Sequence, residues 1–413
     1  MRRVGPVKKK IPFAPAKGCV FRTVMGEESS WGYSKFKTPE AVMAAIGKGL
    51  HWIEKAQNEN GGWGAGSHSR QDIINPHQVE ADPATTAMVA MSLLRSGHTL
   101  TEGRLAPNLR SAVMYLLNAV ETSSESSLNI TTQTGTQIQT KLGANIDVIL
   151  TSQLLSNLSD SEMDSRLKDR IKKAQNICVS KIQRAQEANG AIAGSGWAGV
   201  LQSSFATNAL EAAEKQGADV DPAKLEKARE FQKNNYNAKT GDVNTDMGAG
   251  VVLYSVTGSA RATAKDARKV EEQVKKAKAD GKIEQNAPMS AETLREIGFD
   301  NADAMKYATS YEVYQSAKVT AQRDEVMSGF GNNGGEEFLS YLQTGESMII
   351  NKDDSWEKWY DNTSGRLLTI QNNDGSWQGH HCITSPVFCT ATCLLILAVN
   401  NDIDKLTELG AER

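Results

Sequence analysis

Apolar residues recur at spacings of three and four along most of this chain, which is the period of an amphipathic helix. Val42, Ile46, Leu50 and Ile53 form the first such stripe. The next stretch, NENGGWG, is predicted to be a turn, because Asn and Gly accept the backbone conformations of a tight reversal. The segment that follows, EADPATTAMVAMSLLRSG, is apolar or small on most faces. The pattern therefore predicts a hairpin of one charged helix and one buried helix.

The same hairpin recurs along the chain. A Gln followed four residues later by Gly marks the turn at Gln57, Gln186 and Gln371, and these positions fit two and then three periods of about 62 to 64 residues. Weaker copies near Gly143 and Gly241, with the sequence GFGNNGG in the fifth unit, fill the gaps. Six helical hairpins follow from this count.

Each hairpin buries its apolar helix only if the hairpins stack, and a closed ring leaves no exposed end. We therefore predict an all-α protein, an (α/α)6 toroid over residues 38–400, with apolar helices inside and charged helices outside. Residues 1–37 are expected to form an extended arm and residues 401–413 a C-terminal tail. Within the ring the pattern loosens after about residue 260, where residues 262–281 predict a solvated helix.

Composition narrows the classes of function. The 413 residues carry a formal net charge of −3, which gives no overall attraction to nucleic acid. We expect no membrane span, no secretory signal and a cytoplasmic location, because no apolar run reaches 18 residues. The cysteines are odd in number, which suits a reducing compartment rather than a disulfide framework. They are Cys19, Cys178, Cys382, Cys389 and Cys393.

The turns QNENGGWG, QEANGAIAG and QNNDGSW resemble the QW-type repeats of the prenyltransferase and squalene/terpene cyclase superfamily. The helix TSPVFCTATCLLILAV is similar to the last inner helix of those toroids. We expect Trp63 and Trp377 to pack over their turns, and the three turn glutamines to tie helix ends together. The resemblance implies the toroid fold of that superfamily but not a particular reaction, which has to be argued from other residues.

The catalytic sets that the resemblance implies are incomplete. A class II terpene cyclase protonates an alkene with a D-x-D-D acid, and the nearest match here is NKDD at residues 351–354, which is better explained as a helix cap. A prenyltransferase β subunit holds zinc with Asp, Cys and His ligands, and alignment of the last helix puts Cys389 at the His position. Glu336 and Glu337 remain as candidate catalytic acids, and with Cys389 they would make a non-standard acid or metal site.

The sequence His380-His381-Cys382 is a second candidate for a metal site. Adjacent side chains on an extended loop point in opposite directions, so at most two of the three face one ion easily. His381, Cys382 and Cys389 are the candidate ligands, with zinc as the candidate metal. The alternative is a polar loop beside small buried cysteines.

Hydrolysis of polysaccharides is a further chemistry found on toroids of this kind, and it uses paired carboxylates or a His or Tyr base. Acids expected near the mouth of the ring are spread over four inner helices, which is permissive but unspecific. They are Glu80, Asp82, Asp147, Asp246, Glu336 and Glu337.

Aromatic residues on the inner segments suit either a core or the walls of an apolar cavity. The expected lining residues are Trp197, Tyr254, Phe338, Tyr341 and Phe388. Our prediction is a toroid that acts mainly by binding, either an isoprenoid-like apolar ligand or a protein partner or second copy held through the arm, residues 1–37. The alternative is an isoprenoid-handling transferase or cyclase with a non-standard acid or metal site.

Overall fold

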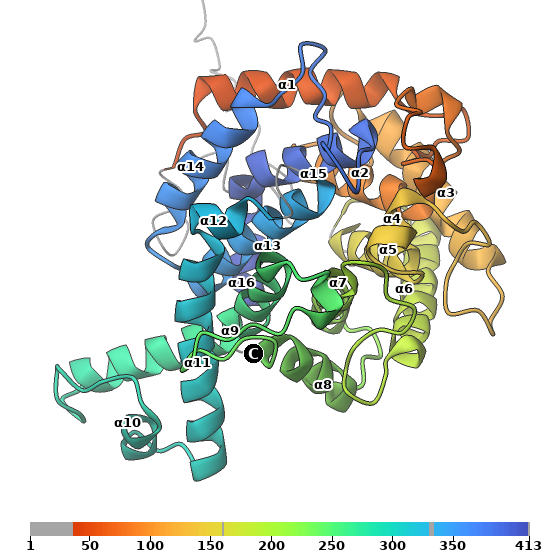
Figure 1. Ribbon diagram of the computed structural model, residues 1–413. Coiled ribbons are helices and arrows are strands. Elements are labelled where there is room, and N and C mark those ends of the chain that lie inside the picture. The colour runs from red at the N-terminus through yellow and green to blue at the C-terminus, as the bar shows by residue number, and fades with distance from the viewer. Residues whose placement is uncertain (1–35, 159–160, 330–333, 412–413) are drawn as a thin grey trace, which may run out of the picture.

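The computed structural model describes residues 36–158, 161–329 and 334–411, and every named element in these ranges is helical. Six helices that carry most of the charge form the outer layer in Figure 1. They are α1 (Glu40–Lys55), α3 (Ala106–Thr122), α6 (Ser165–Ala185), α8 (Pro222–Lys233), α11 (Asn301–Ala321) and α14 (Trp356–Thr369).

Six other helices, each following one outer helix, form the inner layer. They are α2 (Pro83–Arg95), α5 (Ile146–Leu158), α7 (Gly199–Lys215), α9 (Val252–Ala279), α13 (Gly335–Asn351) and α15 (Pro386–Leu397). Each inner helix contacts the next one in this order, and α15 contacts α2, so the ring closes. The predicted (α/α)6 toroid is confirmed.

Burial separates the two layers. Every residue of α2, α13 and α15 is buried, whereas α6 buries one stripe that includes Ile171, Cys178 and Ile182. Polar side chains on the inner helices are tolerated because many are Ser or Thr whose hydroxyls donate to a backbone carbonyl one turn earlier. Thr344 Oγ1, for example, donates to the Ser340 carbonyl at 2.9 Å.

The repeated turn joins neighbouring hairpins. In the first turn, the side-chain amide of Gln57 donates to the carbonyls of Gly61 at 2.7 Å and of Asn108, on α3, at 3.0 Å. Gly61 has φ +86, and a Cβ there would lie 2.8 Å from the Ser111 carbonyl oxygen, so only glycine fits.

The later copies repeat this contact with the hairpin that follows. Gln186 donates to the Lys224 carbonyl of α8 at 2.8 Å, and Gln371 donates to the Ala45 carbonyl of α1 at 3.0 Å. Gln371 therefore ties the last hairpin to the first. The expectation that these glutamines hold helix ends together is confirmed.

The two turn tryptophans also occupy equivalent positions. Trp63 Nε1 donates to the Ile53 carbonyl at 3.0 Å, and Trp377 Nε1 donates to the Leu367 carbonyl at 2.9 Å. Each indole is fully buried and packs over the end of its own outer helix. Their predicted packing is confirmed.

Helix α9 differs from the prediction. The helix predicted over residues 262–281 starts earlier and is partly buried, because α9 runs without a break from Val252 to Ala279 and buries Ala264, Ala267 and Val270. Its only glycine, Gly258, lies in close contact with Gln232 Oε1 of α8 and does not interrupt it. The second half of α9 projects beyond the ring and pairs with α10 (Ala291–Glu296) and α11 (Figure 1).

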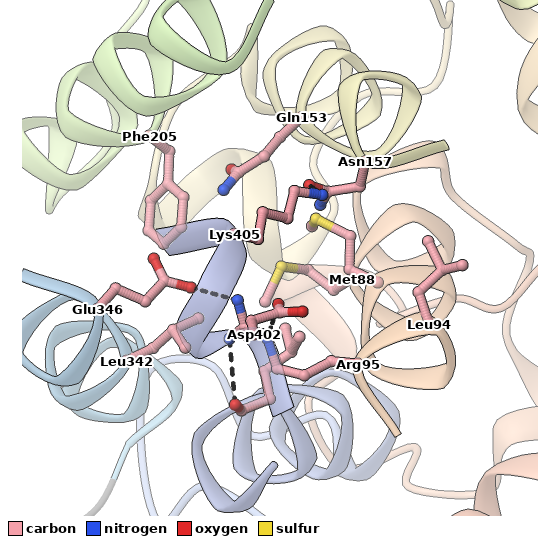
Figure 2. Close-up of a pocket in the computed structure, with 12 residues that line it drawn as sticks. Met88, Leu94, Arg95, Gln153, Asn157, Phe205, Leu342, Glu346, Asp402 and Lys405 are labelled. Atoms are coloured by element: carbon pink, nitrogen blue, oxygen red, sulfur yellow. Dashed lines mark hydrogen bonds and ion pairs between the residues drawn. The ribbon is translucent and has the colours of Figure 1, made fainter. Parts of the chain in front are cut away.

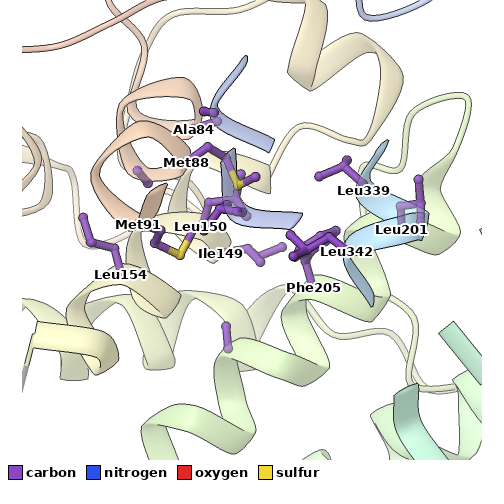
Figure 3. Close-up of a cluster of buried hydrophobic side chains, with 14 of the residues drawn as sticks. Ala84, Met88, Met91, Ile149, Leu150, Leu154, Leu201, Phe205, Leu339 and Leu342 are labelled. Carbon is purple, nitrogen blue, oxygen red and sulfur yellow. The ribbon is translucent and has the colours of Figure 1, made fainter. Parts of the chain in front are cut away.

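The projecting hairpin has a small apolar core of its own. Its buried members are Val270, Val274, Ala277, Ile283, Leu294, Ala304 and Ala308. This core is separate from the main one, in which residues from all six inner helices take part; Figure 3 shows Met88, Ile149, Leu150, Phe205 and Leu342 among them.

The C-terminal residues lie across one end of the ring. The predicted tail, residues 401–413, contains α16 (Ile403–Leu409), preceded by η6 (Val399–Asp402). Ile403 and Leu406 are buried, so this segment is part of the fold. The predicted arm lies outside the described residues except for Phe36 and Lys37, and Phe36 packs edge-on against Trp356 and Tyr360.

Among the described residues, a single helix long and apolar enough to cross a membrane is not found. The bent pair Pro386–Leu397 and Val399–Leu409 meets the length and composition criteria only when its two parts are counted together.

Candidate functional site

The loops that lead into the inner helices meet at one end of the ring, and each of the six hairpins places a reactive or aromatic side chain there. We call these residues the mouth cluster. They are His68, Lys141, Trp197, Tyr254, Glu336 and Cys382.

The first turn of α13 supplies two buried carboxyl groups to the mouth. Glu337 caps its own helix, because its Oε2 accepts the Gly334 N–H at 2.9 Å, and its Oε1 accepts the Tyr254 hydroxyl at 2.9 Å. Glu336 Oε2 accepts the Ile383 N–H at 3.3 Å. The two candidate acids predicted from the sequence therefore lie together in the mouth.

Glu336 is a weak acid in this setting. Burial, and then the neighbouring Glu337 carboxylate, raise the pKa of Glu336 to about 8. Burial and the same Glu337 raise the pKa of the Tyr254 hydroxyl well above its usual value. Glu336 is therefore protonated at neutral pH, with Glu337 and Tyr254 sharing one hydrogen bond beside it.

Cys382 lies beside these acids in an unusual backbone conformation. Its φ is +60, a region that non-glycine residues enter rarely and keep only when their surroundings hold them there. The Gln71 side-chain amide donates to its carbonyl. Burial, and then the nearby Glu336, raise the pKa of the thiol to about 11, so the resting thiol is protonated.

Lys141 connects the acids to the rim. It is the last residue of the short helix α4 (Gln137–Lys141), and its side chain is buried. Its amine lies 4.4 Å from the ring centre of Trp197, in a cation–π contact. Burial, and then the positive charge of Lys141, lower the pKa of His68. One buried cation thus faces a thiol, a carboxyl, an imidazole and an indole.

The structure separates the predicted aromatic lining into two groups. Phe338, Tyr341 and Phe388 are buried in the core, and Tyr254 reaches the mouth only through its hydroxyl. Trp197 precedes α7 and is 61% exposed on the rim.

The candidate metal ligands are not gathered round one point. The Cys389 thiol donates to the Ile383 carbonyl at 3.4 Å, and burial raises its pKa well above the usual value of a thiol. His381 lies against Gly334, while Cys382 faces Lys141. Within the ranges described, three or more His, Cys, Asp or Glu side chains arranged to hold a metal ion are not found. Zinc therefore stays an expectation, with no derived role.

A second pair of buried acids lies at the starts of α2 and α5. Asp82 accepts the N–H groups of Ala65 at 2.8 Å and Thr85 at 2.7 Å, and Asp147 accepts the Ala84 N–H at 3.1 Å. Burial, and then Asp147, raise the pKa of Asp82 to about 7, while burial raises that of Asp147. Both acids were predicted near the mouth, but their pairing was not, because it depends on two helices brought together by the ring.

At the opposite end of the ring, Arg95 of α2 forms two buried ion pairs (Figure 2). It lies 2.7 Å from Glu346 and 2.5 Å from Asp402. These residues, with apolar neighbours such as Met88 and Phe205, line a cavity of about 20 Å³. That volume holds about one water molecule.

The NKDD sequence lies away from the mouth, at the start of α14. Asp353 Oδ1 accepts the Ser355 N–H at 2.9 Å, and its Oδ2 accepts the Tyr314 hydroxyl at 3.1 Å and pairs with Lys318. Although burial opposes it, the hydrogen bond from Lys318 contributes to a lowered pKa of Asp353. Asp353 therefore holds the turn before α14, while the N-cap residue Ser355 makes no side-chain cap hydrogen bond.

Comparison with known families points to the same scaffold. Residues 31–138, which include the first hairpin and Trp63, match the squalene-hopene cyclase C-terminal domain. Over these residues the chain resembles the terpene cyclases. The predicted resemblance to the prenyltransferase and squalene/terpene cyclase superfamily is confirmed.

Two solved structures are similar to this terpene cyclase-like toroid, and both are of the type II terpene cyclase MstE from Scytonema. A variant in complex with its product, merosterolic acid A, has a TM-score of 0.46 and 11% identity, covering 88% of this chain and 97% of that chain. The apo enzyme has a TM-score of 0.45 and 13% identity, covering 87% and 99%. No significant match was found among curated protein sequences.

Proposed function

We propose that this terpene cyclase-like toroid is a binding protein that holds a peptide segment of a protein partner at its mouth. The convergence of one mouth-cluster side chain from each of six hairpins carries the proposal. Residues so far apart in sequence meet at the ring axis only because the toroid brings them there, and binding groups commonly lie on loops positioned by a rigid scaffold.

The rim supplies the kind of surface that anchors a peptide. Trp197 is 61% exposed and Ile74, on the same loop as His68 and Gln71, is 52% exposed. Trp is enriched among the residues that dominate protein interfaces, and the Lys141 amine lies over the Trp197 ring.

The interior of the ring has little room for an isoprenoid ligand. Pockets for small ligands usually enclose about 300 to 1,000 Å³. The cavity between Met88, Phe205 and Leu342 encloses about 20 Å³. The small volume of this cavity argues against an isoprenoid chain inside the ring.

The acids also favour binding over alkene protonation. Protonation of an alkene requires an unusually strong carboxylic acid, whereas Glu336 has a pKa raised to about 8 by burial and Glu337. A carboxyl of that strength exchanges protons readily near neutral pH. It therefore supports a second candidate function, an enzyme that uses Glu336 as a general acid or base in the mouth.

A peptide-display selection tests the proposal. Random peptides are selected on the full chain, and their dissociation constants are measured for the wild type, Trp197→Ala and the control Ile177→Ala, which lies on outer helix α6. We expect at least tenfold weaker binding to Trp197→Ala and little change for the control. Peptides that bind both variants equally would contradict the mouth as the binding surface.

A second experiment tests the enzyme alternative. The chain is incubated with squalene and with geranylgeranyl diphosphate, and the organic extract is analysed by gas chromatography and mass spectrometry. We expect no conversion. A product that disappears in Glu336→Gln would replace the binding proposal with the enzyme.

A further inference from the structure

We propose that the mouth binds an acidic peptide segment, whose Asp or Glu side chain pairs with the Lys141 amine while a neighbouring residue packs on the Trp197 ring. This inference names the class of ligand at the mouth, so it rests on the proposed function. The observation that carries it is a buried cation, in contact with the exposed Trp197, that lacks an acidic partner.

Lys141 differs from the other buried lysines in its partners. Its side chain is 5% exposed. Lys181 donates to two backbone carbonyls, and Lys233 forms an ion pair with Glu230. Among the residues that the structure describes, neither a carboxylate nor a carbonyl oxygen lies within bonding distance of the Lys141 amine.

A buried charge without a counter-charge is costly, so the mouth has a deficit that a ligand can fill. The Trp197 ring attracts the Lys141 amine, 4.4 Å from the ring centre, but carries no charge of its own. The Glu337 carboxylate accepts hydrogen bonds from Tyr254 and from its own helix start. Glu336 is protonated at neutral pH, because burial and then Glu337 raise its pKa to about 8.

His68 adds a second donor to the mouth. The Gln71 Nε2 atom donates to the Cys382 carbonyl and lies 3.2 Å from His68 Nδ1. A carbonyl oxygen only accepts, so this Gln71 atom is the amide nitrogen and His68 Nδ1 is an acceptor. Burial, and then Lys141, lower the pKa of His68, which keeps the ring neutral. Its proton therefore sits on Nε2, where it can be donated to a ligand oxygen.

Backbone hydrogen bonds set these groups in place before a ligand arrives. The His68 N–H donates to the Gly135 carbonyl at 2.9 Å, which joins its loop to the segment just before α4. The Ala198 N–H donates to the Lys141 carbonyl at 2.7 Å, which fixes Trp197 beside the end of α4. Preorganised groups of this kind lose little freedom on binding.

Exposed apolar side chains on the rim define the neighbours of the ligand carboxylate. Trp197 and Ile74 are both exposed, and Ile74 lies on the loop that carries His68. An acidic residue flanked by aromatic or aliphatic residues therefore matches the mouth in both charge and polarity.

Paired peptide libraries test the class of ligand. Both have blocked termini and random flanking positions, and they differ only in a central Glu or Gln. Each is passed over the immobilised full chain, and the retained peptides are quantified by mass spectrometry. We expect the wild type to retain the Glu library about tenfold or more over the Gln library, because a hydrogen bond between charged groups is lost in the second.

Three variants show whether Lys141 is the cause. Lys141→Met should retain both libraries equally, whereas Lys141→Arg, and Lys172→Met on the exposed face of α6, should keep the preference for Glu. The thermal midpoint of Lys141→Met should equal or exceed that of the wild type, because an uncompensated buried charge is removed. A lower midpoint with an unchanged preference for Glu would assign Lys141 a structural role and overturn the inference.

The libraries also separate this inference from the proposed function. Equal retention of the Glu and Gln libraries by the wild type, with loss of both in Trp197→Ala, would leave the peptide-binding mouth in place and overturn its preference for acidic segments. Retention of neither library would contradict peptide binding itself, and the inference would fall with it.

Discussion

The side-chain amide of Gln371 donates to the backbone carbonyl of Ala45 at 3.0 Å, so the sixth hairpin is fastened to the first by the same contact that joins earlier neighbours. We expect Gln371→Ala to lower the free energy of unfolding by about 1 to 3 kcal/mol, because the Ala45 and Gly375 carbonyls each lose a donor. Urea denaturation followed by circular dichroism measures this. The exposed Gln378, in the same turn, provides the control: Gln378→Ala should change stability by less than about 0.5 kcal/mol.

Gly375 is the second element of that closure. It has φ +95, and a Cβ would lie 2.7 Å from the Lys48 carbonyl oxygen of α1. Gly375→Ala should therefore destabilise the protein by about 2 kcal/mol or more. Gly365 lies on the exposed face of α14, where a Cβ would have no neighbour within 4 Å, so Gly365→Ala should stabilise by up to about 1 kcal/mol. Equal effects of the two substitutions on the thermal midpoint would contradict the close contact.

Arg95 is expected to be essential to the closed end of the ring. In Arg95→Met, the carboxylates of Glu346 and Asp402 remain buried without their cation, which costs about 3 to 5 kcal/mol. Neutralising both acids as well, with Glu346→Gln and Asp402→Asn, should recover part of that loss. Chemical denaturation of the single and triple variants measures the difference, and a triple variant less stable than Arg95→Met would contradict this account.

Stability should fall as the pH rises from about 4 to 7, in part because of Asp82. Its folded pKa, about 7, lies above the unfolded value near 4, so the folded state binds the proton more tightly. The resulting stabilisation is complete below the unfolded pKa and is lost as the pH rises through the folded pKa. Between the two values the free energy of unfolding falls by up to about 1.4 kcal/mol per pH unit. The free energy of unfolding, measured by chemical denaturation at several pH values, should depend less on pH for Asp82→Asn than for the exposed control Asp169→Asn.

The ring was predictable because its signals are local. The turn glutamines, Gly61 and the two turn tryptophans act within one hairpin or on the next, and their spacing alone gives the number of units. The position of Asp353 in the turn before α14 was also predictable, since its hydrogen bond reaches a residue only two positions away.

The mouth was only partly predictable, because its contacts join distant segments. Glu336, Glu337 and Cys382 were candidates from their residue types. Lys141 was missed as a single lysine in a loop rich in Ser, Thr and Gln, and Arg95 as a single cation in an apolar helix. The available signal was that each is the one charged residue in an otherwise uncharged segment. The sequence did not show their partners, because these lie on segments that only the closed ring brings together.

Helix α9 is one continuous rod of 28 residues, about 42 Å long. One end bears Tyr254 in the mouth, and the other lies in the projecting hairpin outside the ring. The same helix therefore contributes both to the mouth, through the Tyr254 hydroxyl bonded to Glu337, and to the core of the projecting hairpin.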